Sequence, residues 1–500
     1  MLTGKYFINN RKILEHKHPT IVNALDDVKD VDENVFIEKT RSELLTIRYK
    51  ETLLHSAYDP RREAKKFIEK QKISKGNAIL IFGFGLGYHV EEALTAVGER
   101  GKVFVVEPNR DVLRAALAVR DFTELLADAR FFLISAKKQD ALAMHFLAFI
   151  DRQLINGMDD VKSIVIHEPS LKCLPPEFEK LGETFQMLMM DRRTPDVFRD
   201  KNISNFHGNV RNIVSSSGLS EYANKFKGIP AFYINAGPSL DAALPRLKKY
   251  RAKAIFACCD TALPALIDNG ITPDFVVSVD PQAKSAKHFI GYHNCGAILL
   301  YTPSAFPSIV AGFKGKRIVF LQKNHSLTGK MEDLLGDKGF TYAGSSVSCI
   351  GLDVLMQMGC KDLILVGMDY SFSGGKMYST NVFLGKTWLS CVDRFNTLER
   401  KHYESIRSDK IISIKNKFGE DVPTHRALYS YRRQVEMQIE DSENVSFYNF
   451  ASLGIPIAGA EEIFLDEELD SILRKDIKID LKLRDEEENE ELVVQLMRIL

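Results

Sequence analysis

Short apolar runs alternate with amphipathic stretches over most of the chain. In the first half, the apolar runs cover residues 77–82, 102–109, 129–134 and 163–167. Each run has the length of a buried strand, and the stretches between them repeat apolar residues with helical spacing. Strands that alternate with helices in this way predict an α/β domain with a mostly parallel sheet.

The same alternation starts again after a polar segment at residues 191–206, which is the predicted linker between domains. Helical patterns cover residues 239–250 and 261–269. The predicted strands of this second half are 231–235, 254–258, 275–280, 297–301, 317–321 and 363–367. The fold class is therefore α/β, with two Rossmann-like, doubly wound domains in series.

Both ends of the chain are charge-rich and differ from the parts between them. Residues 34–58 have helix-like spacing, and the acidic stretch from residue 461 places apolar residues on one helical face. These patterns predict helical N- and C-terminal segments, and the C-terminal helices suit a contact in a homo-oligomer. The predicted domains are 1–65 (helical), 66–200 (Rossmann-like, with a Gly-rich loop), 201–460 (the larger, catalytic α/β domain) and 461–500 (helical).

Composition narrows the class of partner and compartment. Lys+Arg and Asp+Glu both number 67, so no global charge attracts nucleic acid. Seven cysteines without a CxxC pair fit neither a disulfide framework nor a zinc site, which favours a reducing cytoplasm. Neither an N-terminal signal sequence nor a run of about 18 uncharged apolar residues is present, so no membrane span is predicted.

A glycine-rich turn follows the first predicted strand. Gly83, Gly85 and Gly87 lie between a strand and a helix, and Glu107 ends the next strand. This order is typical of a nucleotide-binding βαβ unit, and an S-adenosylmethionine methyltransferase would show the same order. A fold that serves only as an acceptor platform or dimer contact fits as well, so the ligand of this domain stays open.

The segment YINAGPSLDAAL places a strand directly before a helix. Gly237 permits close backbone approach, Pro238 suits a first helical turn, and Ser239 can cap the helix. Free amides at that helix start would hold a phosphate, and Asn235 at the strand end would bind a nucleotide sugar or base. A capped turn without any ligand explains the segment equally well.

Three acids follow predicted strands: Asp260, Asp280 and Asp369. Ligands of open α/β sheets bind at the carboxyl ends of strands, so these carboxylates would line one pocket. Each of the three alone would also suit a helix cap. The region has neither a DxD pair nor a histidine-rich cluster, so no metal is expected.

The loop GMDYSFSGGKMYS follows the last of these acids. It carries Tyr370 and Tyr378, whose phenols can donate to a leaving phosphate, and the pair Gly374 and Gly375, which would let the loop close over a ligand. A surface loop whose tyrosines only pack is the alternative.

These stretches together resemble the central domain of the motility accessory factor family, the bacterial flagellin glycosyltransferases, which is similar to bacterial sialyltransferases. The resemblance rests on INAGPSLD, on DTALPALIDNGITPDFVVSVDP, on SSVSCIGLDVLMQMGCKDLILVGMDYSFSGGKMYS and on DVPTHRALYSYRRQVEMQIE. The segments IFGFGLGYHVEEAL and VFVVEPN also resemble the N-terminal domain of that family.

The resemblance implies metal-independent transfer of a nonulosonic acid, of the pseudaminic or legionaminic type, from its CMP conjugate to Ser or Thr of flagellin. It implies that Tyr378, with Tyr370 or Ser371, stabilises the leaving phosphate. In the sialyltransferases the first tyrosine follows the motif aspartate by two positions, where this chain has Ser371. It also implies a downstream histidine base, for which His402 and His425 are the candidates.

The resemblance therefore predicts a cytoplasmic enzyme with a nucleotide-sugar donor, a flagellin acceptor and a role in motility. Two alternatives stay open. Archaeal pterin pyrophosphokinases, which use ATP and Mg²⁺, carry a similar GPSLD-like domain in shorter chains. A flagellin-binding factor without catalytic activity is the other alternative.

Overall fold

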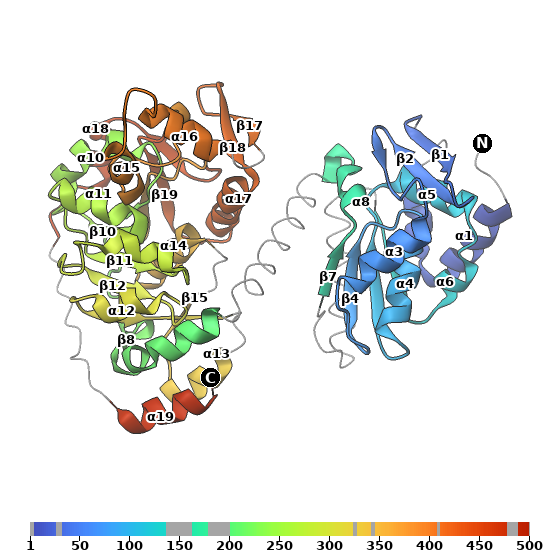
Figure 1. Cartoon of the computed structure of the whole chain (residues 1–500), viewed down its shortest axis with the longest axis horizontal. Coiled ribbons are helices and arrows are strands. Elements are labelled where there is room, and N and C mark those ends of the chain that lie inside the picture. Colours follow the sequence, from blue (N-terminus) through green and yellow to red (C-terminus); the bar gives the residue numbers. More distant parts are fainter. Residues whose placement is uncertain are drawn as a thin grey trace. The chain divides into compact units, whose positions relative to one another are not determined.

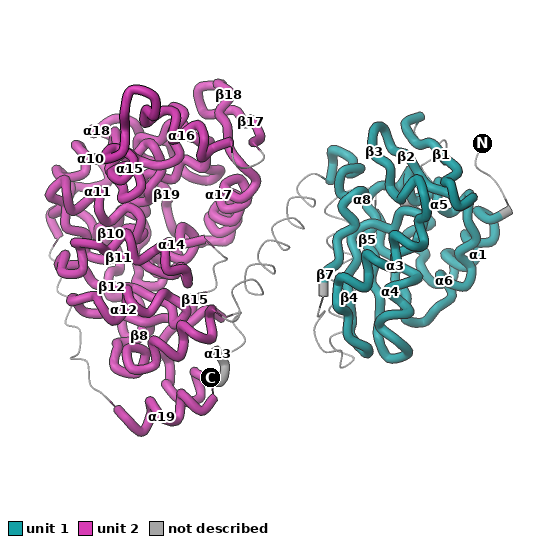
Figure 2. The backbone as a smooth tube through the Cα atoms, in the orientation of Figure 1, with its two compact units in different colours: residues 1–189 teal, residues 190–500 magenta. Residues whose placement is uncertain are grey.

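A computed structural model describes residues 5–26, 33–136, 163–178, 201–323, 328–341, 346–407, 411–477 and 489–499. The chain forms two compact units, residues 1–189 and 190–500, which Figure 2 shows in two colours. The predicted linker falls next to this division. Its residues 191–200 lie outside the described residues, and residues 201–206 belong to a helix over 201–215.

The first unit contains a four-stranded parallel sheet of order β6-β5-β4-β7. Its strands are β4 (Ala78–Phe82), β5 (Lys102–Val106), β6 (Phe131–Ile134) and β7 (Ser163–Ile166), and they confirm the four predicted strands. The strands are apolar throughout because both faces of the sheet are covered. Helices described alongside this sheet are α3 (Pro60–Glu69), α4 (Tyr88–Val97), α5 (Arg110–Val119), α6 (Thr123–Ala127) and α8 (Glu168–Lys172).

The prediction of a separate helical segment over residues 1–65 is wrong in part. Helices α1 (Lys5–Lys17) and α2 (Pro19–Leu25) are present, but residues 35–53 form a three-stranded antiparallel sheet. In it, β1 (Val35–Lys39) pairs with β2 (Leu45–Tyr49), and β3 (Thr52–Leu53) follows. The spacing of apolar residues in this segment fits a helix, but its β-branched residues favour strands, and cross-strand pairing stabilises the sheet. Phe7, Leu14 and Ile47 share one core with β4, so this segment belongs to the first unit.

The second unit is built on a nine-stranded sheet among the described residues, of order β20-β19-β16-β9-β10-β11-β12-β13-β8. Every neighbouring pair is parallel. The six predicted strands are confirmed as β9 (Ala231–Ile234), β10 (Ile255–Cys259), β11 (Phe275–Ser278), β12 (Ile298–Tyr301), β13 (Arg317–Val319) and β16 (Asp362–Val366).

Three further strands complete this sheet: β8 (Ser217–Gly218), β19 (Ser446–Phe450) and β20 (Glu461–Ile463). The start of the predicted C-terminal helical segment is therefore strand β20, whereas α18 (Asp466–Ile472) and α19 (Glu490–Ile499) are helices as predicted. Leu469, Leu473 and Leu496 are buried in the core of the unit, so this segment is not a separate appendage.

The remaining elements cover the two faces of the sheet and its carboxyl edge. The helices are α10 (Leu240–Leu247), α11 (Leu263–Asp268), α12 (Pro307–Gly312), α13 (Thr328–Leu335), α14 (Val347–Gln357), α15 (Phe383–Leu389), α16 (Leu398–Ile406) and α17 (Arg426–Glu440). Two short strand pairs lie outside the main sheet: β14 (Leu321–Gln322) with β15 (Phe340–Thr341), and β17 (Ile411–Lys415) with β18 (Asp421–His425). Among the helices that the structure describes, none has the length and hydropathy that a membrane crossing requires.

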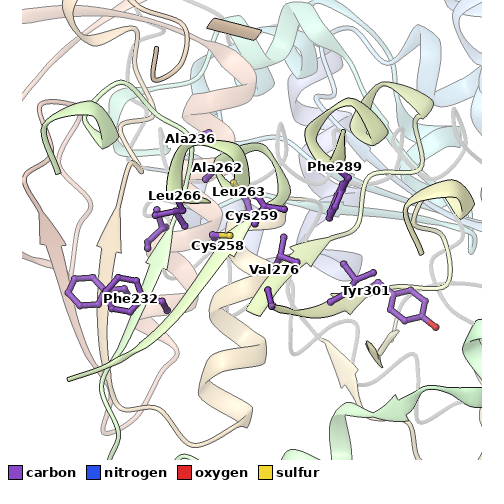
Figure 3. Packing of buried hydrophobic residues seen from close by; sticks show 14 of the residues in the cluster. Phe232, Ala236, Cys258, Cys259, Ala262, Leu263, Leu266, Val276, Phe289 and Tyr301 are labelled. Carbon is purple, nitrogen blue, oxygen red and sulfur yellow. The ribbon is translucent and has the colours of Figure 1, made fainter. Parts of the chain in front are cut away.

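Alternate residues of the strands feed two separate cores. Phe232, Cys258 and Val276 of three neighbouring strands share one core with α10, α11 and α12, and Figure 3 shows part of that packing. Residues of the opposite parity, including Tyr233 and Ala257, pack with α14 and α17. Figure 1 shows these two groups of helices flanking the sheet. The sheet is therefore the middle layer of a doubly wound domain, as predicted.

In each parallel sheet the order in which successive strands are added reverses between two neighbouring strands, and this place is the switch point of the sheet. In the second unit, strands β10 to β13 extend outward from one side of β9, while β16, β19 and β20 extend from the other. In the first unit the reversal lies between β4 and β7. In open α/β sheets, ligands usually bind beside such a switch point, outside the carboxyl ends of the strands. The candidate chemistry described below lies at or near these switch points and on the loops after neighbouring strands.

We expect Gly351→Ala to destabilise the second unit, because a Cβ atom there overlaps the ring and hydroxyl of Tyr233. The ring is fully buried and its hydroxyl donates to the Val347 carbonyl at 2.6 Å, so it has little room to move. Urea unfolding should show a loss of about 1–3 kcal/mol. The control is Gly374→Ala, which meets open space but has φ of 62° and should cost about 1 kcal/mol. Equal losses in the two variants would contradict this account.

Candidate functional site

The loops after β9 and β16 meet at the switch point of the second unit. The Gly237 amide donates to the Gly367 carbonyl at 2.9 Å. A Cβ atom at Gly237 would overlap both that carbonyl oxygen and a carboxylate oxygen of Asp369. The approach of the two loops therefore requires glycine at position 237, for close contact between parts of the protein itself.

Asp369 caps the start of α10. Its Oδ2 accepts hydrogen bonds from the Ser239 amide at 3.0 Å and the Ser239 hydroxyl at 2.8 Å. Burial raises the pKa of Asp369, and the bonds from Ser239 oppose that effect. A carboxylate thus occupies the position where a bound phosphate was predicted.

The neighbouring amides also have acceptors within the chain. Leu240 donates to the Gly237 carbonyl at 3.1 Å, and Asp241 donates to the Pro238 carbonyl at 3.3 Å. The expectation of free amides at this helix start is therefore wrong for Gly237, Ser239, Leu240 and Asp241 in this structure. Any phosphate bound here would have to displace Asp369 or lie beside it.

Asp241 fastens the tyrosine-bearing loop to α10. Its carboxylate accepts from Ser379 Oγ at 2.5 Å, the Thr380 amide at 3.0 Å and Lys376 Nζ at 2.9 Å. Burial would raise the pKa of Asp241, but the bonds from Ser379, Lys376 and Thr380 outweigh it and lower the pKa to about 2. The Ser379 amide also donates to the Ala236 carbonyl at 2.9 Å. The sequence did not predict this role of Asp241, although an acid in the first helical turn after a tight strand–helix turn indicates an acceptor for a neighbouring loop.

Tyr378 lies near the acids that follow β10 and β11. Burial raises the pKa of Tyr378, and the nearby Cys259, Tyr431, Asp260 and Asp280 act in the same direction. The phenol is therefore neutral at physiological pH and keeps its proton for donation in a hydrogen bond. Tyr431 of α17 is a member of this cluster that the sequence did not reveal, because it comes from a distant segment.

Asp260 is the most perturbed acid of this cluster. Burial raises the pKa of Asp260 to about 6, opposed by hydrogen bonds from Thr261 and Ser278 and assisted by the charge of Asp280. Thr261 donates its amide at 2.7 Å, and Ser278 donates its hydroxyl at 3.2 Å. The structure thus brings Asp260, Asp280 and Tyr378 together, whereas the third predicted acid serves as a helix cap.

Tyr370 has a different environment from Tyr378. It is 7% exposed, and its φ of 50° is unusual for a residue with a large side chain. Its carbonyl accepts from Thr424 Oγ1 at 2.7 Å, and burial raises the pKa of its phenol. Its neighbour Ser371 is also buried and shares a hydrogen bond with Ser373 at 2.7 Å.

The glycine pair of this loop forms an exposed turn. Gly374 and Gly375 are exposed, both have positive φ, and a Cβ atom on either would meet open space. They shape the turn of the loop, and no contact of theirs indicates a ligand.

Asn235, directly after β9, contacts the first turn of α14. Its Oδ1 accepts from Ser348 Oγ at 3.1 Å, while its Nδ2 is buried without a hydrogen-bond partner among the described residues. Ser346 caps the same helix by accepting from the Cys349 amide at 3.2 Å. A buried amide nitrogen without an acceptor indicates a place for a ligand oxygen. The SSVSC stretch before an apolar run was the sequence signal for Ser348.

Both candidate histidine bases already accept a backbone hydrogen bond. His402 Nδ1 accepts from the Met377 amide at 3.1 Å, and His425 Nδ1 accepts from the Leu428 amide at 3.1 Å as the cap of α17. The proton of each neutral ring is then on Nε2, so neither ring keeps a free basic nitrogen. Burial and Lys376 lower the pKa of His402.

The arginines of α17 pair within the helix. Arg432 and Arg433 both contact the carboxylate of Glu436, which is 4% exposed, and Arg432 also donates to the Pro456 carbonyl at 3.0 Å. The buried Glu436 carboxylate therefore pairs with both guanidinium groups.

The glycine-rich turn of the first unit is closed by the protein's own side chains. Glu107 Oε2 accepts from the Phe84 amide at 2.8 Å and the Gly85 amide at 3.4 Å. His55 Nε2 accepts from the Leu86 amide at 2.8 Å. Burial raises the pKa of Glu107 to about 7, and those amide bonds limit the rise. These groups occupy the positions that a nucleotide would take in a ligand-binding turn of this type.

Two family models match parts of the chain. Residues 47–131 match a family described as glycosyltransferase Maf N-terminal domain, and residues 204–375 match a family described as 6-hydroxymethylpterin diphosphokinase MptE-like. The resemblance to the motility accessory factor glycosyltransferases is thereby confirmed for residues 47–131. The second match covers Asn235, Asp260, Asp280 and Asp369 and ends before Tyr378.

Two similar curated proteins are uncharacterized proteins of Treponema pallidum. One is 38% identical over 61 residues, which are 12% of this chain and 29% of the relative. The other is 25% identical over 263 residues, which are 49% of this chain and 86% of the relative. A structure of the Maf glycosyltransferase from Magnetospirillum magneticum aligns over 99% of this chain and 77% of its own length, at 15% identity and a TM-score of 0.45.

We expect Asp241→Asn to loosen the loop over residues 376–381, because the neutral amide loses its ion pair with Lys376. Hydrogen exchange of those amides should become faster. The folded pKa of about 2 lies below the unfolded value of 3.8, so the stabilisation is present above pH 4 and is lost as the pH falls towards 2. It amounts to roughly 2 kcal/mol. The control is Asp268→Asn, which removes the exposed pair with Lys386. Equal exchange rates of the 376–381 amides in the two variants would contradict the role of Asp241 in holding this loop.

Proposed function

We propose that this chain is a cytoplasmic glycosyltransferase that moves a nonulosonic acid from its CMP conjugate to Ser or Thr hydroxyls of flagellin. The observation that carries the proposal is the cluster of Asp260, Asp280 and Tyr378 after neighbouring strands of the second sheet, in a chain whose residues 47–131 match the Maf N-terminal domain. Asn235 lies directly after the adjoining strand β9.

The nucleotide half of the donor suits the acids of this cluster and the amide of Asn235. Carboxylates of Asp260 and Asp280 can accept from ribose hydroxyls or the cytosine amino group. The buried Nδ2 of Asn235 can donate to an oxygen of the donor, and the start of α14 beside it favours negative charge. None of these roles requires a metal ion.

The reaction breaks the bond between the anomeric carbon and the CMP phosphate oxygen, and forms a bond from that carbon to the acceptor oxygen. The departing phosphate gains negative charge, which the neutral phenol of Tyr378 stabilises by donating a hydrogen bond. Tyr370 is assigned only to positioning, because its phenol is buried in the core that packs on α14 and α17.

A base must accept the proton of the acceptor hydroxyl. His288 fits this role better than His402 or His425 because its Nδ1 has no hydrogen-bond partner among the described residues. Burial lowers the pKa of His288 and keeps the ring neutral, while the nearby carboxylate of Asp280 opposes that effect. A carboxylate that faces a neutral imidazole stabilises the imidazolium formed on proton uptake.

The second candidate is a pterin diphosphokinase, favoured by the family match over residues 204–375. Such an enzyme would transfer a diphosphate from ATP with Mg²⁺. Asp260 and Asp280 are then the ligands for the cation, since hard carboxylate oxygens suit Mg²⁺. A flagellin-binding factor without catalysis would leave the whole cluster unused.

We expect flagellin co-expressed with this protein and a nonulosonic acid pathway to gain mass in whole sugar residues, as measured on the intact protein. Tyr378→Phe should lower the transfer rate from CMP-sugar about 10²–10³-fold and leave the fold intact. Thermal stabilisation by CMP checks donor binding separately. The proposal fails if flagellin gains no mass while ATP, Mg²⁺ and 6-hydroxymethylpterin yield a diphosphate product.

We expect His288→Gln to lower transfer about 10²–10⁴-fold, the range for loss of a general base, with little change in KM for the donor. His402→Gln and His425→Gln should act through local structure and change kcat less. His293→Gln is the matched control, since His293 also has a buried Nδ1 without a partner. A larger loss of transfer rate in His425→Gln than in His288→Gln would contradict this assignment and identify His425 as the base.

A further inference from the structure

Three buried histidines meet at the switch point of the first unit. His55 follows β3, His89 lies in α4, and His167 follows β7; they are 3%, 1% and 6% exposed. One ring nitrogen from each lies within 4.8 Å of the others. The rings of His89 and His167 stack with centroids 4.3 Å apart. The three residues come from distant parts of the sequence, which is why no histidine motif marks them.

The hydrogen bonds of His89 leave one nitrogen free. Its Nε2 lies 2.8 Å from the Gly83 carbonyl and therefore carries the proton. Its Nδ1 is buried and has no hydrogen-bond partner among the described residues. A histidine that donates one N–H to a backbone carbonyl and keeps a bare lone pair has the arrangement of metal-ligating histidines.

The other two histidines follow related patterns. His167 bonds to the Leu54 backbone, and its Nδ1 lies 2.8 Å from Ser170 Oγ, a hydroxyl that can rotate away. His55 Nε2 accepts the Leu86 amide, so His55 must exchange that bond for a metal bond. Burial lowers the pKa of His89 to about 4, and those of His55 and His167 well below their usual value. All three rings are therefore neutral at pH 7, as metal ligands must be.

The space that a nucleotide would need at this switch point is filled by these side chains. A Cβ atom on Gly83 would overlap Ser170 and approach His167, and one on Gly85 would lie 2.6 Å from His55 Nε2. The amides of the glycine-rich turn already have acceptors in Glu107 and His55. The groups that remain available to bind a ligand at this site are therefore the imidazole nitrogens of the three histidines.

We propose that His55, His89 and His167 bind one divalent transition-metal ion of the Zn²⁺ type. Tetrahedral Zn²⁺ with nitrogen ligands at 2.0–2.1 Å places them about 3.3 Å apart, so the stacked rings of His89 and His167 must rotate until their lone pairs converge on the ion. The fourth position is open to water or to the Ser170 hydroxyl. The ion would join the end of the N-terminal antiparallel sheet, α4 and the end of β7, and it has no part in sugar transfer.

The test uses the full chain after treatment with a chelator. Co²⁺ is added as the probe, and its visible spectrum and bound stoichiometry are measured. We expect one equivalent with the intense absorption of a tetrahedral site, and a rise in Tm of roughly 5–10 °C at a hundredfold excess of metal over Kd. No uptake, or only the weak spectrum of an octahedral hydrated ion, would overturn the proposal.

Variants then locate the ion. His89→Gln and His167→Gln should abolish the tetrahedral spectrum, whereas His293→Gln in the second unit should retain it. Ser170→Ala keeps all three imidazoles and should also retain it, which guards against a loss caused only by misfolding around the buried rings. Full uptake in folded His89→Gln protein would show that the metal binds elsewhere and would overturn the assignment. Transfer activity is measured separately and should follow Tyr378, not these histidines.

Discussion

The hydrogen bonds from Ser239 to Asp369 join the loops that follow β9 and β16, the two strands at the switch point of the second sheet. They form because Gly237 has no side chain to keep the two loops apart. The tyrosine-bearing loop is then held on the same helix start by Asp241. The position of Tyr378 depends on these contacts, because its loop is held at the start of α10, whereas Asp260 and Asp280 are positioned by the ends of β10 and β11.

Carboxylates take the place of a bound anion at both switch points. Asp369 accepts the Ser239 amide at the start of α10, and Glu107 accepts the Phe84 and Gly85 amides of the glycine-rich turn. Both acids are buried, and burial raises the pKa of each. A buried carboxylate persists only where several donors compensate its desolvation, and strand–helix turns supply those donors. The same backbone geometry that suits a phosphate therefore also suits a side chain of the protein.

The two units differ in what remains beside these carboxylates. In the second unit the neighbouring groups are acids, a neutral phenol and a buried amide nitrogen, which suit a polar nucleotide sugar. In the first unit they are three imidazoles in an apolar setting. The fold is shared, and the side chains at the strand ends decide which chemistry each unit supports.

The sequence by itself determined the strands of both parallel sheets that are long and continuously apolar, because burial on both faces leaves that pattern whatever the neighbours are. It also determined which acids and tyrosines follow those strands. It did not determine the antiparallel sheet at residues 35–53, where β-branched residues suit two structures and cross-strand contacts chose one.

Only the tertiary structure decided which of several chemically equal groups face one another. It assigned Asp369 to a helix cap and Asp260 to the cluster with Tyr378, and it gave His402 and His425 backbone donors. It also gathered His55, His89 and His167 from positions far apart in the chain. These outcomes depend on distances between loops that the packing of the whole unit sets, and a linear pattern of residue types carries no information about them.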